Sequence, residues 1–242
     1  MKGEPAQTHS SRLSAQEIAP IIPYSAKATW PAGFQIYQRG AHADGVFMVL
    51  EGHVVLRNRI KTGRAFVPSI ATVGQAFGSE GLSGNGKYVT DANASDEART
   101  LFLSSSQFRA FVRERSGEAL AFVSQMMSEH AHLLERLHEL AALSVDERLA
   151  ATLGVLSADS SFTDSSGRLK LENGHHRLLC EMVAATRESI TLALSRLVIA
   201  GIAERDGTTF LIAPALLHAT RPQAGNGETT VPLTRELARP TS

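Results

Sequence analysis

Short apolar runs separated by glycine-rich or polar turns fill the chain from residue 28 to about residue 103. They are rich in β-branched and aromatic residues, and their length is typical of strands. Several such strands in close succession predict an antiparallel barrel or jelly roll. The predicted strands are residues 34–37, 45–50, 53–56, 65–70, 75–77, 87–90 and 101–103.

The spacing becomes helical after this region. Phe108, Phe111 and Val112 predict a short helix over residues 106–115, and a longer helix follows over residues 117–143. Side chains at alternating spacings of three and four form an a/d seam on the long helix: Val123, Met126, His130, Leu133, Leu137 and Leu140. Because a helix of this length between two domains has little of its own chain to cover, we expect a homodimeric coiled coil with His130 facing its symmetry mate.

Ser144 marks the boundary between the two halves of the chain. The segment Ser144-Val145-Asp146-Glu147 is a capping box, which predicts that a new helix begins there. The apolar residues 150–156 continue this helix. A Ser/Asp/Gly-rich loop is predicted over residues 157–167, followed by a short strand at 168–171. We therefore expect Ser144 to act as a hinge.

Residues 175–212 predict a winged helix-turn-helix. The first helix has an apolar stripe, and the small residues Ala184 and Ala185 let a second helix approach closely. Thr186 is a good N-cap for that second helix, and Gly201 ends it. Asp206-Gly207 predicts a hairpin turn, the wing. The apolar positions of the two helices are Leu178, Leu179, Met182, Val183, Ile190, Ala193, Leu194, Leu197 and Val198.

The start of the second helix carries exposed polar side chains that suit DNA reading. An arginine can bond guanine O6 and N7 together, and a glutamate can accept from the cytosine amino group. A helix pair of this size is often plain core, but the cap, the charges and the wing together favour DNA. The predicted contact residues are His176, Arg177, Thr186, Arg187, Glu188, Thr191, Leu192 and Arg196.

The length of 242 residues and the hydrophobic content of 43% are sufficient for more than one core. We divide the chain into a mobile arm (1–20), a sensor domain (21–115), a dimerisation helix (116–143), a DNA-binding domain (144–218) and a disordered tail (219–242). No apolar run is long enough to span a bilayer, and the N-terminus lacks a signal-peptide core, so we expect a cytoplasmic protein without membrane contact.

Charge and cysteine content narrow the chemistry. Residues 144–218 carry 7 Lys+Arg against 9 Asp+Glu, so DNA binding must rely on a few local groups, and we expect weak non-specific affinity. The only cysteine, Cys180, excludes an intrachain disulfide, a cysteine-based zinc site and a four-cysteine iron–sulfur cluster. It remains a candidate thiol sensor or a small packing residue. We expect no metal site, although nine histidines leave haem open.

A jelly roll, a long helix and a C-terminal winged helix in this order resemble the CRP/FNR family of bacterial transcription regulators. The resemblance covers about residues 25–213, and ATRESITLALSRL with the wing is its most specific part. It implies an α+β fold and a homodimer without enzymatic activity. The dimer would bind double-stranded DNA at a pseudo-palindromic operator, respond to a small-molecule effector and have RNA polymerase as a further candidate partner.

The resemblance also locates an effector pocket, in which this sequence departs from the family. Ser79 stands where the family has the ribose-binding carboxylate, and the neighbouring Glu80 points to the other side if this segment is extended. Tyr88 stands at the place of the phosphate-binding arginine. An apolar pair on the long helix replaces the polar pair that meets the adenine. The candidate pocket residues are Gly78, Ser79, Glu80, Lys87, Tyr88, Val89, Leu133 and Leu134.

These departures argue against a conventional high-affinity cAMP site. The pocket could instead hold another effector, bind cAMP weakly or be vestigial. A cAMP-responsive regulator and a thiol- or haem-responsive regulator remain alternatives. A cupin-type metal enzyme is a more distant one, with His53 and Glu51 as scattered candidate ligands. On the DNA side, Leu192 aligns with the family's third base reader. A leucine can touch only a thymine methyl, so we expect an altered half-site.

Overall fold

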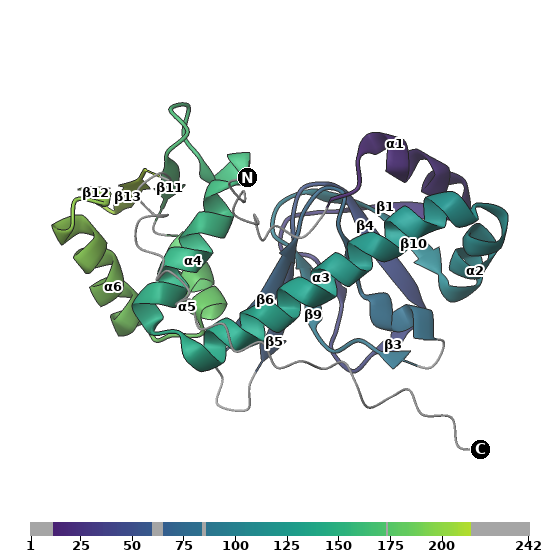
Figure 1. The fold of residues 1–242 in the computed structure, drawn as a ribbon, viewed down its shortest axis with the longest axis horizontal. Coiled ribbons are helices and arrows are strands. Elements are labelled where there is room, and N and C mark those ends of the chain that lie inside the picture. Colours follow the sequence, from purple (N-terminus) through teal and green to yellow (C-terminus); the bar gives the residue numbers. More distant parts are fainter. Residues whose placement is uncertain (1–11, 60–64, 84–85, 173, 214–242) are drawn as a thin grey trace, which may run out of the picture.

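The computed structural model describes residues 12–59, 65–83, 86–172 and 174–213. Its N-terminal half is a β-barrel of two four-stranded antiparallel sheets, ordered β1-β10-β4-β7 and β2-β9-β5-β6, with a small β3-β8 pair beside them (Figure 1). The strands are β1 (Ala26–Trp30), β2 (Gln35–Tyr37), β3 (His42–Ala43), β4 (Gly45–Glu51), β5 (Val54–Arg59), β6 (Ala65–Ala71), β7 (Ala76–Phe77), β8 (Gly86–Lys87), β9 (Asp91–Ala94) and β10 (Ala98–Ser104). The predicted jelly roll is therefore confirmed.

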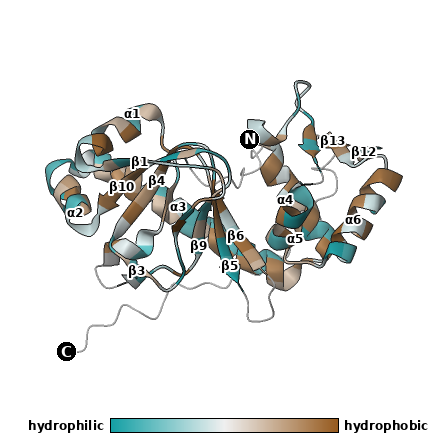
Figure 2. Cartoon of the chain, turned by 180° about the vertical axis from the view of Figure 1, so that it is seen from behind, coloured by the Kyte–Doolittle hydropathy of each residue, from teal (hydrophilic) through white to brown (hydrophobic). Residues whose placement is uncertain are grey.

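The alternation of side chains along β4 explains how this barrel forms. Val46 and Met48 pack with Leu101 on one side of the sheet, whereas Phe47 and Val49 belong to the cluster on the other side. Strands β4 and β10 are correspondingly hydrophobic in Figure 2. The sequence pattern misses β1, β3 and β9 because these strands are short or carry polar residues. The strand predicted at 87–90 includes only Lys87, as the last residue of β8.

The predicted mobile arm over residues 1–20 is wrong for residues 12–20. Helix α1 (Ala15–Ile18) begins with a capping box between Ser14 and Glu17 and leads into the 3-10 helix η1 (Ala19–Tyr24). Leu13 and Ile18 are buried in the barrel's core. Burial of these two side chains holds the segment on the barrel, an effect that a short polar stretch does not reveal. Residues 1–11 lie outside the described part of the chain.

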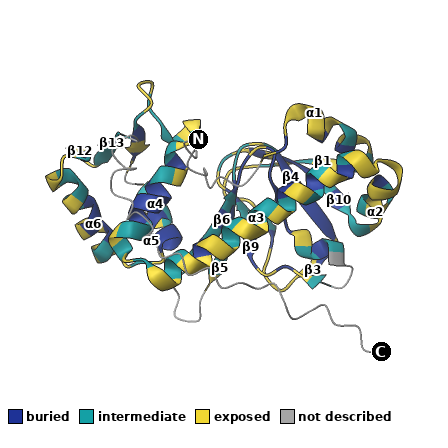
Figure 3. Cartoon of the chain, in the orientation of Figure 1, coloured by how far each residue is buried: buried dark blue, intermediate teal, exposed yellow. Residues whose placement is uncertain are grey.

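Helix α2 (Ser105–Glu114) leads into α3 (Ser116–Ala142), which runs along the barrel to the C-terminal domain (Figure 1). One face of α3 packs on the barrel's core through Ala119, Phe122 and Met126. The opposite face is exposed along much of the helix (Figure 3). Its large apolar side chains are Leu120 (66% exposed), Met127 (59%), Leu134 (54%) and Leu137 (61%).

This exposed stripe differs from the predicted seam. Val123 and Leu137 fit both, because each lies three or four residues from its neighbours in either stripe. Met126, however, packs against the barrel, and Met127 takes its place on the outer face. Leu134 likewise replaces Leu133. Both residues are apolar in each of the pairs 126/127 and 133/134. Only contact with the barrel decides which residue of a pair faces inward.

The C-terminal domain consists of α4 (Val145–Ser157), the 3-10 helix η3 (Ser160–Phe162), β11 (Leu169–Leu171), α5 (His175–Val183), α6 (Arg187–Ile199), β12 (Ala203–Asp206) and β13 (Thr209–Ile212). Its three strands form one antiparallel sheet ordered β11-β13-β12. The predicted capping box at Ser144 is present, with Glu147 as its second member. The predicted tail, residues 219–242, lies outside the described residues.

The turn between α5 and α6 depends on one unusual residue. Ala184 caps α5 with φ +54° and is the one non-glycine with a positive φ among the described residues. Its Cβ makes this conformation unfavourable, whereas Gly201, at φ +70°, ends α6 without such a cost. Ala184 therefore forms the left-handed cap of α5. The sequence predicts only that its small size lets the two helices approach closely.

Replacing Ala184 with glycine should stabilise the protein. Removing the Cβ relieves the left-handed strain, and this gain exceeds the added freedom of the unfolded chain, so we expect the free energy of unfolding to rise by roughly 0.5–1 kcal/mol. Urea denaturation measures the change. Ala185→Gly is the matched control and should lower stability, since Ala185 has an ordinary backbone conformation. An Ala184→Gly protein less stable than wild type would contradict this account of the turn.

Candidate functional site

The start of α6 presents the side chains predicted to read DNA. The Thr186 hydroxyl accepts a hydrogen bond from the Ser189 amide at 3.2 Å, as an N-cap should. Ile190, Ala193 and Leu194 are buried. The exposed residues on the other face are Arg187, Glu188, Thr191 and Leu192, of which Leu192 is 54% exposed. Helix α6 lies on the outer side of the C-terminal domain (Figure 1).

Two opposite charges stand side by side at this helix start. Hydrogen bonds from its own backbone amide and from the Thr186 hydroxyl lower the pKa of Glu188, so its carboxylate is ionised at neutral pH and can only accept. Within the described part of the chain, the Arg187 guanidinium makes no ion pair. It is therefore available to an external acceptor.

The remaining predicted DNA contacts are engaged inside the protein. Arg177 donates to the buried Glu181 carboxylate at 3.0 Å, and Arg196 pairs with Asp146 of α4 at 2.5 Å. The His176 Nε2 and the Thr191 hydroxyl oxygen are 3.2 Å apart. Burial and the nearby Arg187 charge lower the pKa of His176, so this ring is neutral at neutral pH.

Cys180 lies half-buried on α5, with its Sγ 3.5 Å from the His176 Nδ1. Burial raises the pKa of the thiol, and this effect outweighs the opposing influence of Arg187. A thiol sensor needs a lowered pKa because the thiolate is the reactive form. The position of Cys180 thus favours packing over sensing.

Aromatic rings fill the barrel where the resemblance places the phosphate-binding arginine. The Tyr88 ring is 6% exposed and stacks on Tyr37 with 3.7 Å between ring centroids and 9° between planes. Phe47 and Phe77 pack beside Tyr37. Burial raises the pKa of Tyr88 to about 12, so the ring brings no charge. Gly78 is needed here, since a Cβ would come within 3.0 Å of the Tyr88 ring.

The other predicted pocket residues lie on three parts of the chain: the Ser79–Ser83 turn, β8 with the residues after it, and α3. The segment Ser79–Ser83 is a 3-10 turn, so the expectation that Ser79 and Glu80 are extended is wrong. The Glu80 carboxylate accepts the Val89 amide at 3.2 Å. Lys87 and Val89 are exposed. Leu134 lies on the outer face of α3, and its neighbour Leu133 is half-buried.

The structure also shows an interdomain contact that the sequence did not indicate. Arg57 of β5 donates to the Glu181 carboxylate of α5, with Nη2 2.8 Å and Nε 2.9 Å from Oε2. Glu181 is only 6% exposed. Because Glu181 also accepts from Arg177, both of its oxygens are satisfied by guanidinium groups. Sequence patterns give no signal for this pair, since its members lie 124 positions apart.

A histidine makes a second interdomain contact. The His53 ring lies 2.7 Å from Asp96 of the barrel through Nδ1 and 3.1 Å from Asp159 of the C-terminal domain through Nε2. Both carboxylates can accept only if both ring nitrogens carry a proton. Burial raises the pKa of Asp159, but hydrogen bonds from Ser161 and the interaction with His53 lower it by more, so the carboxylate is ionised.

The side chains considered as cupin-type ligands are engaged in different contacts. Glu51 pairs with Arg99 at 2.6 Å, while His53 faces the two aspartates. Among the described residues, no group of three His, Cys, Asp or Glu side chains is arranged to hold a metal ion. Over the same residues, no helix is long and apolar enough to cross a membrane.

Comparison with known proteins agrees with this architecture. Residues 27–115 match the cyclic nucleotide-binding domain family. A CRP-like cAMP-activated global transcriptional regulator of Mycobacterium tuberculosis is 21% identical over 205 residues, which cover 84% of this chain and 91% of that protein.

Solved structures with the same fold include the c-di-GMP responsive global regulator CLP of Xanthomonas campestris. It has a TM-score of 0.69 at 18% identity over 82% of this chain and 99% of that one. A CRP/FNR family transcriptional regulator of Thermus thermophilus has a TM-score of 0.66 at 22% identity over 81% and 100%. All three proteins are named as regulators. The chain therefore has a cyclic nucleotide-binding domain over residues 27–115 and, as a whole, the architecture of the CRP/FNR transcription regulators.

Proposed function

We propose that this protein is a homodimeric DNA-binding transcription regulator of CRP/FNR type, with an effector pocket that has diverged from a conventional cAMP site. The observation that carries the proposal is the start of α6. Among the described residues the Arg187 guanidinium makes no ion pair, and it stands beside an ionised Glu188 on an exposed, capped helix directly before a wing. This arrangement is complementary to the donor and acceptor edges of a G·C pair in the major groove.

Arg187 and Glu188 are the proposed base readers, with Thr186 contacting phosphate. Arg177 and Arg196 are held by Glu181 and Asp146, so each must exchange an intramolecular partner before it can contact DNA. The exposed Leu192 offers only apolar contact, and we therefore propose that the half-site differs from the catabolite-activator consensus at the base that it faces.

The exposed stripe on α3 supports the homodimer. Leu120, Met127 and Leu134 recur every seven residues and Leu137 follows three after Leu134, which is the spacing of a coiled-coil seam. Pairing of two such helices would place two α6 helices on half-sites about one helical turn apart. An effector would then act by changing the orientation of the two domains about the Ser144 hinge.

The filled barrel supports the divergent pocket. Tyr88 and Tyr37 occupy the interior, and no guanidinium replaces the arginine that a cyclic phosphate needs at this position. The relative from M. tuberculosis is named as cAMP-activated and the neighbour from X. campestris as c-di-GMP responsive, so regulators of this fold differ in effector. The family match over residues 27–115 keeps a cAMP-responsive regulator as the second candidate.

Replacing Arg187 with alanine should remove base reading at one position of the operator. Because a bidentate arginine discriminates against the wrong base by about 1–3 kcal/mol, we expect a roughly 5- to 150-fold loss of preference at a single base pair in each half-site. Binding selection from random DNA, followed by sequencing, measures this preference. Arg205→Ala, an exposed arginine of the wing, is the control. An Arg187→Ala protein with unchanged base preference would remove the assignment.

Introducing a charge on the outer face of α3 should break the dimer. Leu134→Glu places two carboxylates at one seam position, so we expect a monomer in analytical ultracentrifugation and weakened operator binding. Val112→Glu, on an exposed position of α2, should remain dimeric. If Leu134→Glu stays a dimer, the stripe is not the interface.

Calorimetry with cAMP tests the effector side of the proposal. Because Tyr88 fills the barrel and provides no positive charge, we expect no binding with a Kd below about 1 mM. Operator affinity should also be unchanged by cAMP in a parallel titration. Micromolar binding that alters operator affinity would support the second candidate instead.

A further inference from the structure

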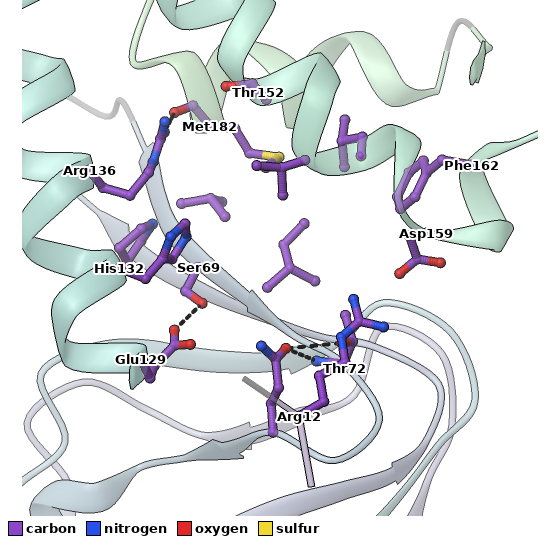
Figure 4. A pocket seen from close by; sticks show the side chains of 16 residues that line it. Arg12, Ser69, Thr72, Glu129, His132, Arg136, Thr152, Asp159, Phe162 and Met182 are labelled. Atoms are coloured by element: carbon purple, nitrogen blue, oxygen red, sulfur yellow. Dashed lines mark hydrogen bonds between the residues drawn. The ribbon is translucent and has the colours of Figure 1, made fainter. Parts of the chain in front are cut away.

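A cavity of about 90 Å³ lies between the barrel and the C-terminal domain. Its walls come from β6 on the barrel side, α3 along one edge, and α4, η3 and α5 on the other side. Figure 4 shows Arg136, His132, Ser69 and Glu129 on one side of it and Asp159 and Phe162 on the other. The aromatic residues that fill the barrel interior, such as Tyr88, are not part of this wall.

The charges around this cavity are balanced, and most of them have partners. The Glu129 carboxylate accepts from the Ser69 hydroxyl at 2.6 Å, and Arg136 donates to the Met182 carbonyl at 2.6 Å. Asp159 faces the His53 ring. Arg12 supplies the second positive charge. With two arginines against two carboxylates, the lining has no net formal charge that would favour an anion or a cation.

Two polar atoms of the wall, by contrast, have no partner. Thr152 is 1% exposed, and its hydroxyl makes no hydrogen bond within the described part of the chain. The His132 Nδ1 is also buried and unpaired there. Buried polar groups are normally satisfied, so a ligand that supplies a donor and an acceptor would remove an existing penalty. The rest of the wall is largely apolar: Val67, Ile70, Val155, Leu156, Phe162 and Met182.

We propose that this interdomain cavity is a binding site for a small uncharged molecule with an apolar body and a hydroxyl or amide group. Its volume of about 90 Å³ is below the roughly 150 Å³ of an apolar cavity that admits benzene, so the occupant is no larger than a single small ring. A cyclic dinucleotide or a phosphate monoester fits neither this size nor the balanced charge.

The position of the cavity gives its occupant a regulatory role. Since its walls belong to both domains, a bound molecule contacts them only in the docked arrangement and shifts the population towards it. The consequence for operator affinity rests on the proposed function. Binding itself does not, because it can be measured without DNA.

Methionine methyl NMR reads out the site directly in the full-length protein. Met182 lines the cavity, whereas Met48 lies in the barrel core and Met127 on the outer face of α3. Titration with phenol and benzamide, up to about 20 mM, should give a saturable shift of the Met182 methyl alone, with a Kd in the millimolar range. Benzoate, similar in shape but charged, should bind at least about tenfold more weakly. Absence of a Met182 shift with both neutral probes would overturn the proposal.

Two variants locate the binding. Val155→Phe fills the cavity and should abolish the Met182 shift, while Val112→Phe, at a matched exposure of 38% against 37%, should not. Thr152→Val keeps the side-chain volume. It should lower the affinity for phenol several-fold and leave the affinity for toluene unchanged, because toluene has no hydroxyl group that could pair with Thr152. A shift that persists in Val155→Phe, or equal losses for phenol and toluene in Thr152→Val, would overturn the assignment. If the Met182 methyl shifts but the protein binds no operator DNA, the binding site is supported and the proposed function is contradicted.

Discussion

The ion pair between Arg57 and Glu181 is the contact on which the arrangement of the two domains depends. Glu181 is almost completely buried, and a carboxylate in that environment is stable only if cations satisfy both of its oxygens. Arg57 comes from the barrel and Arg177 from the helix that carries Glu181. Around this pair, Val55 and Val67 of the barrel share one apolar cluster with the core of the C-terminal domain. The docked arrangement therefore combines a buried charge that needs its partner with apolar side chains packed between the two domains.

Aromatic rings fill the barrel where the resemblance places a phosphate-binding arginine. Gly78 allows Tyr88 to lie flat on Tyr37, and the stacked rings with Phe47 and Phe77 supply the volume that a pocket would leave empty. An arginine at the Tyr88 position would be a buried charge in this apolar cluster and would need an anion. Filling the interior with aromatic rings removes that requirement.

Helix α3 meets two demands at once. Its inner face must cover the barrel's core through Phe122 and Met126, while its outer face carries Met127 and Leu134 into solvent. The sequence predicts the long helix correctly, but it contains apolar residues at adjacent positions, so two heptad stripes one residue apart fit it equally well. The rotation of the helix about its axis is fixed by the barrel. The predicted position of Met126 at the partner-facing seam is wrong for this reason.

Features that depend on neighbouring residues follow from the sequence alone. They are the capping box at Ser144, the cap at Thr186, the glycine at the end of α6 and most strands of the barrel. Each expresses local hydrogen bonding and steric preference, so a short window predicts it. Contacts between residues that are distant in the chain depend on packing. Packing brings together the Tyr88 stack, the contacts of His53 with two aspartates and the Arg57–Glu181 pair. It also holds Ala184 in a left-handed conformation. Their energies depend on burial, which no local pattern encodes.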